Sequence, residues 1–326
     1  MFDLLFCYKY NGLIIFMKIF LLFLLRYVCY FIVICWLRLL VFQLLAFFIW
    51  FCGFFVLYLF QPKVYVYMKH PLLMGTVAGD VIGSEYEFNP VKTTDFSIFG
   101  DTCEFTDDTI MTMAVAEWVM GNGKLIPLMQ KYGRNYPSSY GTKFALWIYY
   151  REPHPYNSWG NGSAMRVSPV GWAYDTMEET LAKAKESAEV THNHPEGIKG
   201  AQIVAAAIFL ARTGASKGEI KDYLQKSFGI DLHTSCEIIR PVYKFYESCQ
   251  MTVPQSVVAF LESKDYEDAV RLAISLGGDA DTLAAITGSI AEAYYKEIPS
   301  YIVDETTRRL PDKFLKVMKE FSRKFG

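Results

Sequence analysis

Most of the chain after residue 73 consists of runs in which apolar residues recur every three or four positions. Such runs include residues 107–120, 176–190 and 196–213, and several more follow between residues 217 and 326. This spacing is typical of amphipathic or buried helices, and no stretch of this region shows the sustained two-residue alternation of a strand. We therefore predict a single compact, multi-helix, all-α domain over residues 74–326. Two loop-rich stretches, 85–106 and 133–171, interrupt it where Gly, Pro, Asn and Ser gather.

The first 61 residues have a different composition from the rest. They contain only five charged side chains: Asp3, Lys9, Lys18, Arg26 and Arg38. Residues 41–60 hold Gln43 as their polar exception, and about 20 apolar residues are enough to cross a bilayer. Residues 19–37 form a second such stretch, although Arg26 inside it makes insertion costly. The composition of this N-terminal segment therefore predicts one or two transmembrane helices.

Two interpretations of this head remain open. If both stretches span a membrane, the lysines on their outer flanks share one compartment, and the positive-inside rule makes that compartment the cytoplasm. Alternatively, the domain begins at Met74, and residues 1–73 are translated upstream sequence. We therefore divide the chain into an apolar head, 1–73, and a cytoplasmic domain, 74–326. That domain would be membrane-anchored if residues 1–61 are expressed.

Charge and cysteine content exclude several classes of protein. A formal net charge of −2 gives no dominant electrostatic attraction to nucleic acid. The seven cysteines are odd in number and show no CxxC or CxxH spacing. This argues against a disulfide scaffold and a zinc site, and indicates free thiols in a reducing compartment.

Two predicted helices begin with paired aspartates next to a threonine. The residues are Thr106, Asp107 and Asp108 in one, and Asp279, Asp281 and Thr282 in the other. Helix capping and the helix dipole explain one acidic N-terminus. They explain two less well, because neighbouring carboxylates repel each other unless a cation or a proton intervenes. Oxygen ligands of this kind suit Mg²⁺, Mn²⁺ or Ca²⁺ rather than Zn²⁺. If the two N-termini converge, they form a binuclear site that orients a substrate and activates a water.

The loop around Asn161 is a second candidate. Gly160, Gly162 and Ser163 are small, so their backbone N–H groups can approach an anion closely, and Asn161 and Ser163 add side-chain donors. The simpler interpretation of this loop is a turn.

Histidines and glutamates supply two further candidates. His192 and His194 lie between two predicted helices, where His192 could bond a sugar or phosphate or be satisfied by the backbone. Glu85 and Glu87 follow a glycine-flanked helical turn, where a carboxylate could act as a base or form part of a surface pair.

Five stretches in order resemble the ADP-ribosylglycohydrolase family: "GDVIGSEYEF", "FTDDT", "YNSWGNGSAMR", "SAEVTHNHPEGIKGA" and "SLGGDADTLAAITGSIAEAYY". The resemblance covers residues 74–301 and implies an all-α hydrolase. It would cleave the glycosidic bond at the anomeric carbon of ADP-ribose, in an ADP-ribosylated protein or a small ADP-ribosyl substrate. The family pattern also implies two divalent cations, Mg²⁺ or Mn²⁺. We expect the chain to be monomeric.

The resemblance also implies roles for individual residues. The implied metal ligands are Thr106, Asp107, Asp108, Asp279, Asp281 and Thr282. Glu87 takes the position near the metals and the reacting ribose, whereas Glu85 does not. Asn161, Gly162 and Ser163 match the diphosphate loop, and His192 matches a contact with ADP-ribose. Tyr243, Phe245 and Tyr246 are candidates for stacking on adenine. The alternative is a non-catalytic member of the same fold that binds ADP-ribose or serves a structural role.

Overall fold

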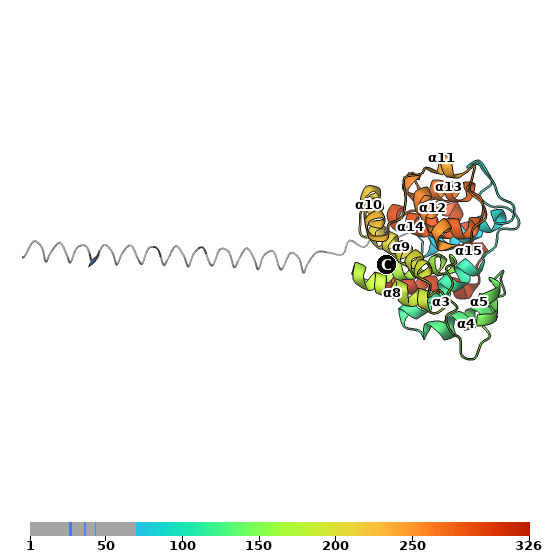
Figure 1. Cartoon of the computed structure of the whole chain (residues 1–326), viewed down its shortest axis with the longest axis horizontal. Helices are drawn as coiled ribbons and strands as arrows, with labels where there is room; N and C mark the ends of the chain where they lie inside the picture. The colour runs from blue at the N-terminus through green and yellow to red at the C-terminus, as the bar shows by residue number, and fades with distance from the viewer. Residues whose placement is uncertain (1–25, 28–35, 37–42, 44–69) are drawn as a thin grey trace, which may run out of the picture. The chain divides into compact units, whose positions relative to one another are not determined.

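Helices form the regular structure of the residues that the computed structural model describes, which are 26, 27, 36, 43 and 70–326 (Figure 1). Their bounds are α2 (Met74–Gly83), η1 (Ser84–Tyr86), α3 (Asp107–Met120), α4 (Leu125–Asn135), α5 (Thr142–Trp147), α6 (Gly162–Met165), α7 (Ser168–Ala173), α8 (Met177–Glu189), α9 (Pro195–Arg212), α10 (Lys217–Phe228), α11 (Cys236–Ile239), α12 (Cys249–Glu262), α13 (Tyr266–Ser275), α14 (Ala280–Tyr295), α15 (Ser300–Arg308) and α16 (Asp312–Phe325). Within these residues the one β-type pairing is an isolated bridge between Gly160 and Ser248. The all-α prediction is therefore confirmed for the described part of the chain.

The chain divides into two units, Met1–Tyr65 and Val66–Gly326. The predicted membrane-spanning stretches, 19–37 and 41–60, lie almost entirely outside the described residues. In the part that is described, no helix is both long and apolar enough to cross a membrane.

A stripe of glycines brings α2 and α14 into direct backbone contact. Gly75, Gly79 and Gly83 recur every four residues, so they lie on one face of α2. A Cβ atom added at Gly79 would lie 2.2 Å from the carbonyl oxygen of Ala284, and one at Gly75 would lie 2.5 Å from that of Gly288. Only glycine allows this approach, so the stripe places the side chains of α2 close to the first turn of α14.

The opposite end of the same helix pair is closed by a buried carboxylate. Glu292 of α14 is fully buried, and its Oε2 accepts a hydrogen bond of 3.0 Å from the backbone N–H of Gly75. Burial raises the pKa of Glu292 to about 8. The acceptor faces the N-terminus of α2, where the helix has free N–H groups. The two helices are therefore tied together at this end as well.

A two-glycine turn sets the start of α14. Gly277 and Gly278 have φ values of 72° and 78°, which lie in the left-handed region that favours glycine. The ammonium group of Lys92 holds this turn by donating to the carbonyl of Leu276 and, at 2.8 Å, to that of Tyr243. Asp279 follows as the N-cap residue of α14.

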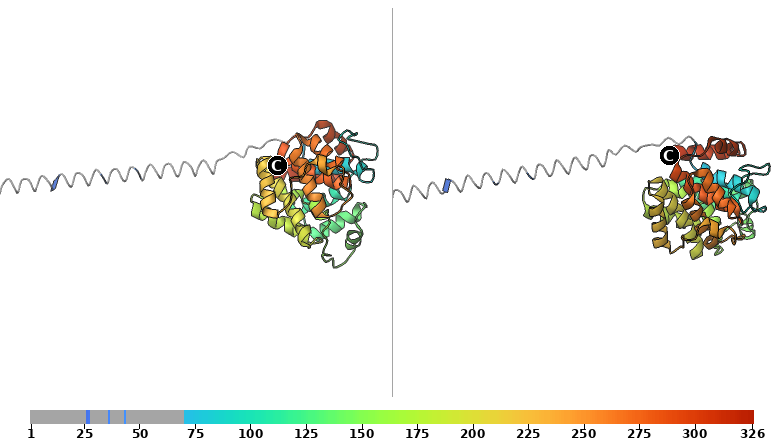
Figure 2. Two further views of the ribbon diagram at one scale, coloured as in Figure 1. Left: turned by 45° about the horizontal axis from the view of Figure 1, so that its top comes forward. Right: turned by 90° about the horizontal axis from the view of Figure 1, so that it is seen from above.

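The predicted loop at 133–171 is only partly irregular. It contains α5 and α6 and the start of α7, short helices that lack a long periodic pattern of their own. They gain stability from packing: Gly171 of α7 lies so close to α9 that an added Cβ would be 2.6 Å from Ile208. Figure 2 shows the C-terminal helices, in red, along one edge of the bundle, and α16 packs against α3. The cysteines of residues 70–326, Cys103, Cys236 and Cys249, are free, as predicted, and they are also buried.

Candidate metal centre

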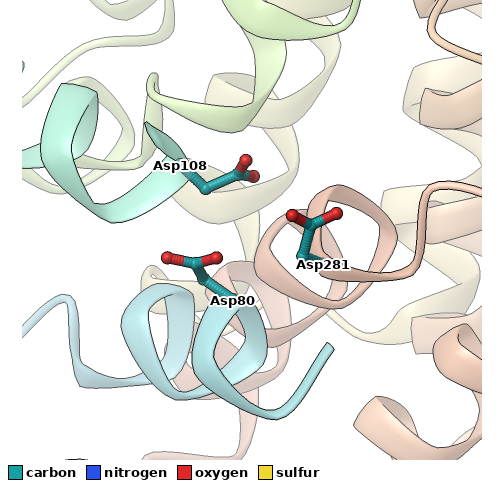
Figure 3. A group of neighbouring side chains, drawn as sticks. All are labelled: Asp80, Asp108 and Asp281. Atoms are coloured by element: carbon teal, nitrogen blue, oxygen red, sulfur yellow. The ribbon is translucent and has the colours of Figure 1, made fainter. Parts of the chain in front are cut away.

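Three carboxylates from three different helices meet inside the domain (Figure 3). They belong to Asp80 of α2, Asp108 of α3 and Asp281 of α14, and one oxygen from each lies within 4.8 Å of the others. A second group under the same limit consists of Glu87, Asp279 and Asp281. Asp281 belongs to both groups and lies where they join.

Hydrogen bonds connect the two acidic helix N-termini that the sequence singled out. The hydroxyl of Thr282 donates to Oδ2 of Asp108 at 3.3 Å, and the backbone N–H of Thr282 donates to Oδ1 of Asp281 at 2.8 Å. Thr106 is the N-cap residue of α3, and its hydroxyl accepts from the N–H of Asp108. The structure therefore brings together side chains that are more than 170 positions apart in the sequence.

Asp80 was not among the residues that sequence reasoning singled out. Its carboxylate accepts hydrogen bonds from the backbone N–H groups of Thr106 and Thr109, at 2.9 and 3.1 Å, and from both threonine hydroxyls. Asp80 thus fixes the N-terminus of α3 against α2. A usable signal was present: it is the lone charged residue in an otherwise Gly-, Ala- and Val-rich helix, and a buried charge needs partners.

The electrostatics of the cluster favour a cation. Burial, followed by repulsion from neighbouring carboxylates, raises the pKa of Glu87 and Asp107 to about 8. Burial also raises the pKa of Asp279 to about 6, and the pKa values of Asp108 and Asp281 are raised well above their usual range by burial and by the neighbouring carboxylates. Oδ1 of Asp108 is buried and has no hydrogen-bond partner among the described residues. An unpartnered oxygen inside a cluster of carboxylates fits the ligand set of a hard divalent cation.

These groups line a cavity of about 350 Å³. The predicted site residues that line it are Glu87, Asp107, Asp108, Asn161, Gly162, His192, Asp279, Asp281 and Thr282. Thr106 and Ser163 do not line it. The hydroxyl of Ser163 is buried behind the cavity wall and donates to the carbonyl of Gly197 at 2.7 Å.

Hydrogen bonds fix the positions of two other candidate residues, Asn161 and Glu85. The side-chain amide of Asn161 donates to Oδ2 of Asp279 at 2.6 Å, so the glycine loop is bound to the N-terminus of α14. Glu85 accepts from the backbone N–H of Thr102 at 3.2 Å and from its hydroxyl, in a loop outside the cavity lining. Glu87, two residues later, lines the cavity instead.

The fold agrees with comparisons against known proteins. A sequence profile described as ADP-ribosylglycohydrolase matches residues 71–325, and the chain belongs to this family. The resemblance inferred from the motifs is thus confirmed. The family in general depends on divalent metal, and the acidic cluster is able to bind one.

Named relatives include hydrolases of more than one kind. The mouse protein ADP-ribosylhydrolase ARH3 is 24% identical over an alignment of 305 residues. The match covers 68% of this chain and 82% of the mouse protein. The ADP-ribosylarginine hydrolase Tri1 of Pseudomonas putida (strain GB-1) is 26% identical over 258 residues, covering 68% of this chain and 69% of Tri1. A solved structure titled "ADP-ribosylglycohydrolase-related protein complex" has a TM-score of 0.60 and 25% identity, covering 78% of this chain and 96% of its own.

Proposed function

We propose that this chain is a metal-dependent hydrolase that removes ADP-ribose from a modified protein or small acceptor. The observation that carries the proposal is the meeting of Asp80, Asp108 and Asp281 beside a cavity, with one buried carboxylate oxygen unpartnered among the described residues. The relatives named above as ADP-ribosyl hydrolases support the same substrate class.

The two clusters of three carboxylates suggest two cation positions. Asp80, Asp108 and Asp281 would hold one cation, Glu87, Asp279 and Asp281 the other, and Thr106, Asp107 and Thr282 stand beside them. When bound there, Mg²⁺ or Mn²⁺ would neutralise the clustered charge, orient the distal ribose and make a water more acidic. Sharing Asp281 would keep the two positions close together.

Glu87 is suited to proton transfer. Its carboxyl lies at the cavity wall and is half-buried, within reach of a water or an acceptor atom in the cavity. Hydrolysis adds the oxygen of water to the anomeric carbon, breaks the bond from that carbon to the acceptor, and returns a proton to the acceptor. Cleavage of this kind passes through a state with oxocarbenium character, which nearby carboxylates stabilise.

The cavity also offers contacts for the rest of ADP-ribose. Gly160, Gly162 and His192 form one wall, as expected for a diphosphate site. Of the three aromatic candidates for the adenine, Phe245 lines this cavity and is 44% exposed. The hydroxyl of Tyr243 instead donates to the carbonyl of Met251 at 2.9 Å, and its side chain is buried. Tyr246 does not line this cavity, and we therefore assign adenine stacking to Phe245.

The decisive test is release of free ADP-ribose by the full-length chain. The substrates would carry ADP-ribose on arginine, on serine and on a small acceptor, each assayed with Mg²⁺ and with a chelator. Release that requires the metal supports the proposal. A rise in melting temperature on addition of ADP-ribose, without release from any substrate, would favour the non-catalytic alternative.

Replacing Glu87 with Gln should lower kcat by about a hundredfold or more, because an amide cannot accept or deliver the proton. Binding of ADP-ribose should persist, since the change is nearly isosteric. Glu85→Gln is the matched control and should retain its rate, because Glu85 contacts Thr102 rather than the cavity. Equal rates for the two variants would remove Glu87 from the mechanism.

The gain in melting temperature on adding Mg²⁺ should be larger at about pH 8 than at about pH 6. The raised pKa values of Asp279, about 6, and Asp107, about 8, mean that the metal-free folded state keeps protons that the unfolded state has lost. Stability of the metal-free protein is therefore lost as pH rises through these values. A cation displaces those protons and restores the stability.

Differential scanning fluorimetry would measure this effect, with KCl at matched ionic strength as control. A gain in melting temperature that is the same at both pH values would contradict coupling between the cation and these carboxyls.

A further inference from the structure

A buried guanidinium forms part of the cavity lining beside the glycine loop. Arg166 is 1% exposed, and among the described residues no carboxylate pairs with it. One Nη donates to the carbonyl of Gly162 at 2.9 Å, and the other to the carbonyl of Ser187 at 3.0 Å and to the hydroxyl of Thr191 at 2.9 Å. Burial lowers the pKa of Arg166 to about 10, so the group stays cationic at neutral pH.

Thr191 passes this hydrogen bond on to His192. A threonine hydroxyl has one hydrogen to donate, and Nη2 of Arg166 already donates to its oxygen. Nδ1 of His192 lies 2.7 Å from the same oxygen and is its one described acceptor for that hydrogen. We infer that the hydroxyl donates to Nδ1, because this arrangement uses its one hydrogen, whereas donation from Nδ1–H would leave that hydrogen without a described acceptor. Burial and the adjacent positive charge of Arg166 hold the pKa of His192 well below its usual value, so the ring is neutral.

A neutral ring that accepts at Nδ1 carries its proton on Nε2. This nitrogen faces the glycine loop: a Cβ added at Gly162 would lie 3.3 Å from it, and one at Gly160 would lie 3.5 Å from it. Nε2 forms no hydrogen bond within residues 70–326, and His192 lines the cavity. Its N–H is therefore available to an acceptor at the cavity wall.

We propose that Arg166 and Thr191 are positioning residues that hold His192 as an Nε2–H donor toward the diphosphate of ADP-ribose. The identity of the ligand rests on the function proposed above, whereas the hydrogen-bond chain rests on the contacts of Arg166, Thr191 and His192 alone. A neutral donor suits an anion at this wall, and the guanidinium of Arg166, in the same cavity lining, adds a favourable field. The chain also explains why an arginine without a carboxylate partner is kept in the interior.

The test compares two threonine-to-valine variants in the full-length chain. Thr191→Val removes the hydroxyl between Arg166 and His192. Thr180→Val removes an equally buried hydroxyl that donates only to the carbonyl of Thr176, at 2.8 Å on α8. Thr191→Ser keeps the hydroxyl and serves as the rescue. Nitrogen-15 NMR of histidine-labelled protein would report which ring nitrogen carries the proton, with His192→Gln assigning the signal, and calorimetry would give the Kd for ADP-ribose.

We expect the wild-type ring to carry its proton on Nε2. Thr191→Val should mix the two tautomers and raise the Kd about tenfold, the effect of losing one hydrogen bond to a charged group. Thr191→Ser should restore both readouts, and Thr180→Val should change neither. A wild-type proton on Nδ1, or equal Kd values for the two valine variants, would overturn the proposal. The expected tautomer without any binding of ADP-ribose would refute the ligand, and with it the proposed function.

Discussion

Asp281→Asn should lower the rate of ADP-ribose release by about 10³-fold or more, a loss of about 4 kcal/mol of transition-state stabilisation. The effect is large because Asp281 is a member of both carboxylate clusters. One substitution therefore weakens both cation positions. An amide keeps the size of the side chain and removes its charge. The chain should therefore stay folded while turnover is lost.

The same variant should make the metal-free protein more stable. Burial, Asp279 and Asp80 raise the pKa of Asp281, and Asp281 helps to raise that of Asp108, so removing its ionisable group relieves repulsion in a buried site. The melting temperature without metal should rise, and the gain on adding Mg²⁺ should shrink. Asp304→Asn, at an exposed position of α15, is the control and should alter neither. Retained turnover with normal metal content would refute the assignment of Asp281.

Gly79→Ala should destabilise the protein by about 3 kcal/mol or more, at the upper end of overpacking substitutions. The added Cβ would lie 2.2 Å from a backbone carbonyl of α14, which cannot turn aside as a flexible side chain can. Relief requires α2 and α14 to move apart. Because Asp80 lies on α2 and Asp281 on α14, the same movement should separate two carboxylates of the cluster and lower activity.

Urea unfolding and the release assay would measure the two effects in parallel. Gly218→Ala on α10 is the matched control, since the nearest atom to its added Cβ is Oγ of Ser216 at 4.0 Å. That variant should be unchanged or more stable by about 0.4–1 kcal/mol, because alanine restricts the unfolded chain. Equal stability of the two alanine variants would contradict close packing along the glycine stripe.

The long helices could be predicted because their signals are local. The predicted run 107–120 coincides with α3, and 196–213 is shifted by one residue from α9. Both depend on apolar periodicity and on caps that lie within a few residues. The short helices α5, α6 and α7 could not be predicted, because each is too short for a periodic pattern and is stabilised by contacts with distant elements.

The residues of the candidate site also differ in whether a local sequence signal marks them. Paired aspartates beside a threonine are visible in the sequence, and they indicated the N-termini of α3 and α14. Asp80 is the lone charge of α2, but its part in the site depends on the packing of α2 against α14, which lies far away in the chain. The contact between Arg166 and Thr191 likewise spans 25 positions and follows from no local motif.

The glycine stripe between α2 and α14 has a consequence for inherited variation in this chain. It runs from Gly75, beside Glu292, to Gly83, whose added Cβ would lie 2.4 Å from Cα of Asp281. A missense change at either end should push the same pair of helices apart, so we expect inactivating alleles along the whole stripe rather than only around the pocket. An exchange of glycine for alanine on this face of α2 would then impair the protein even though every carboxylate is kept.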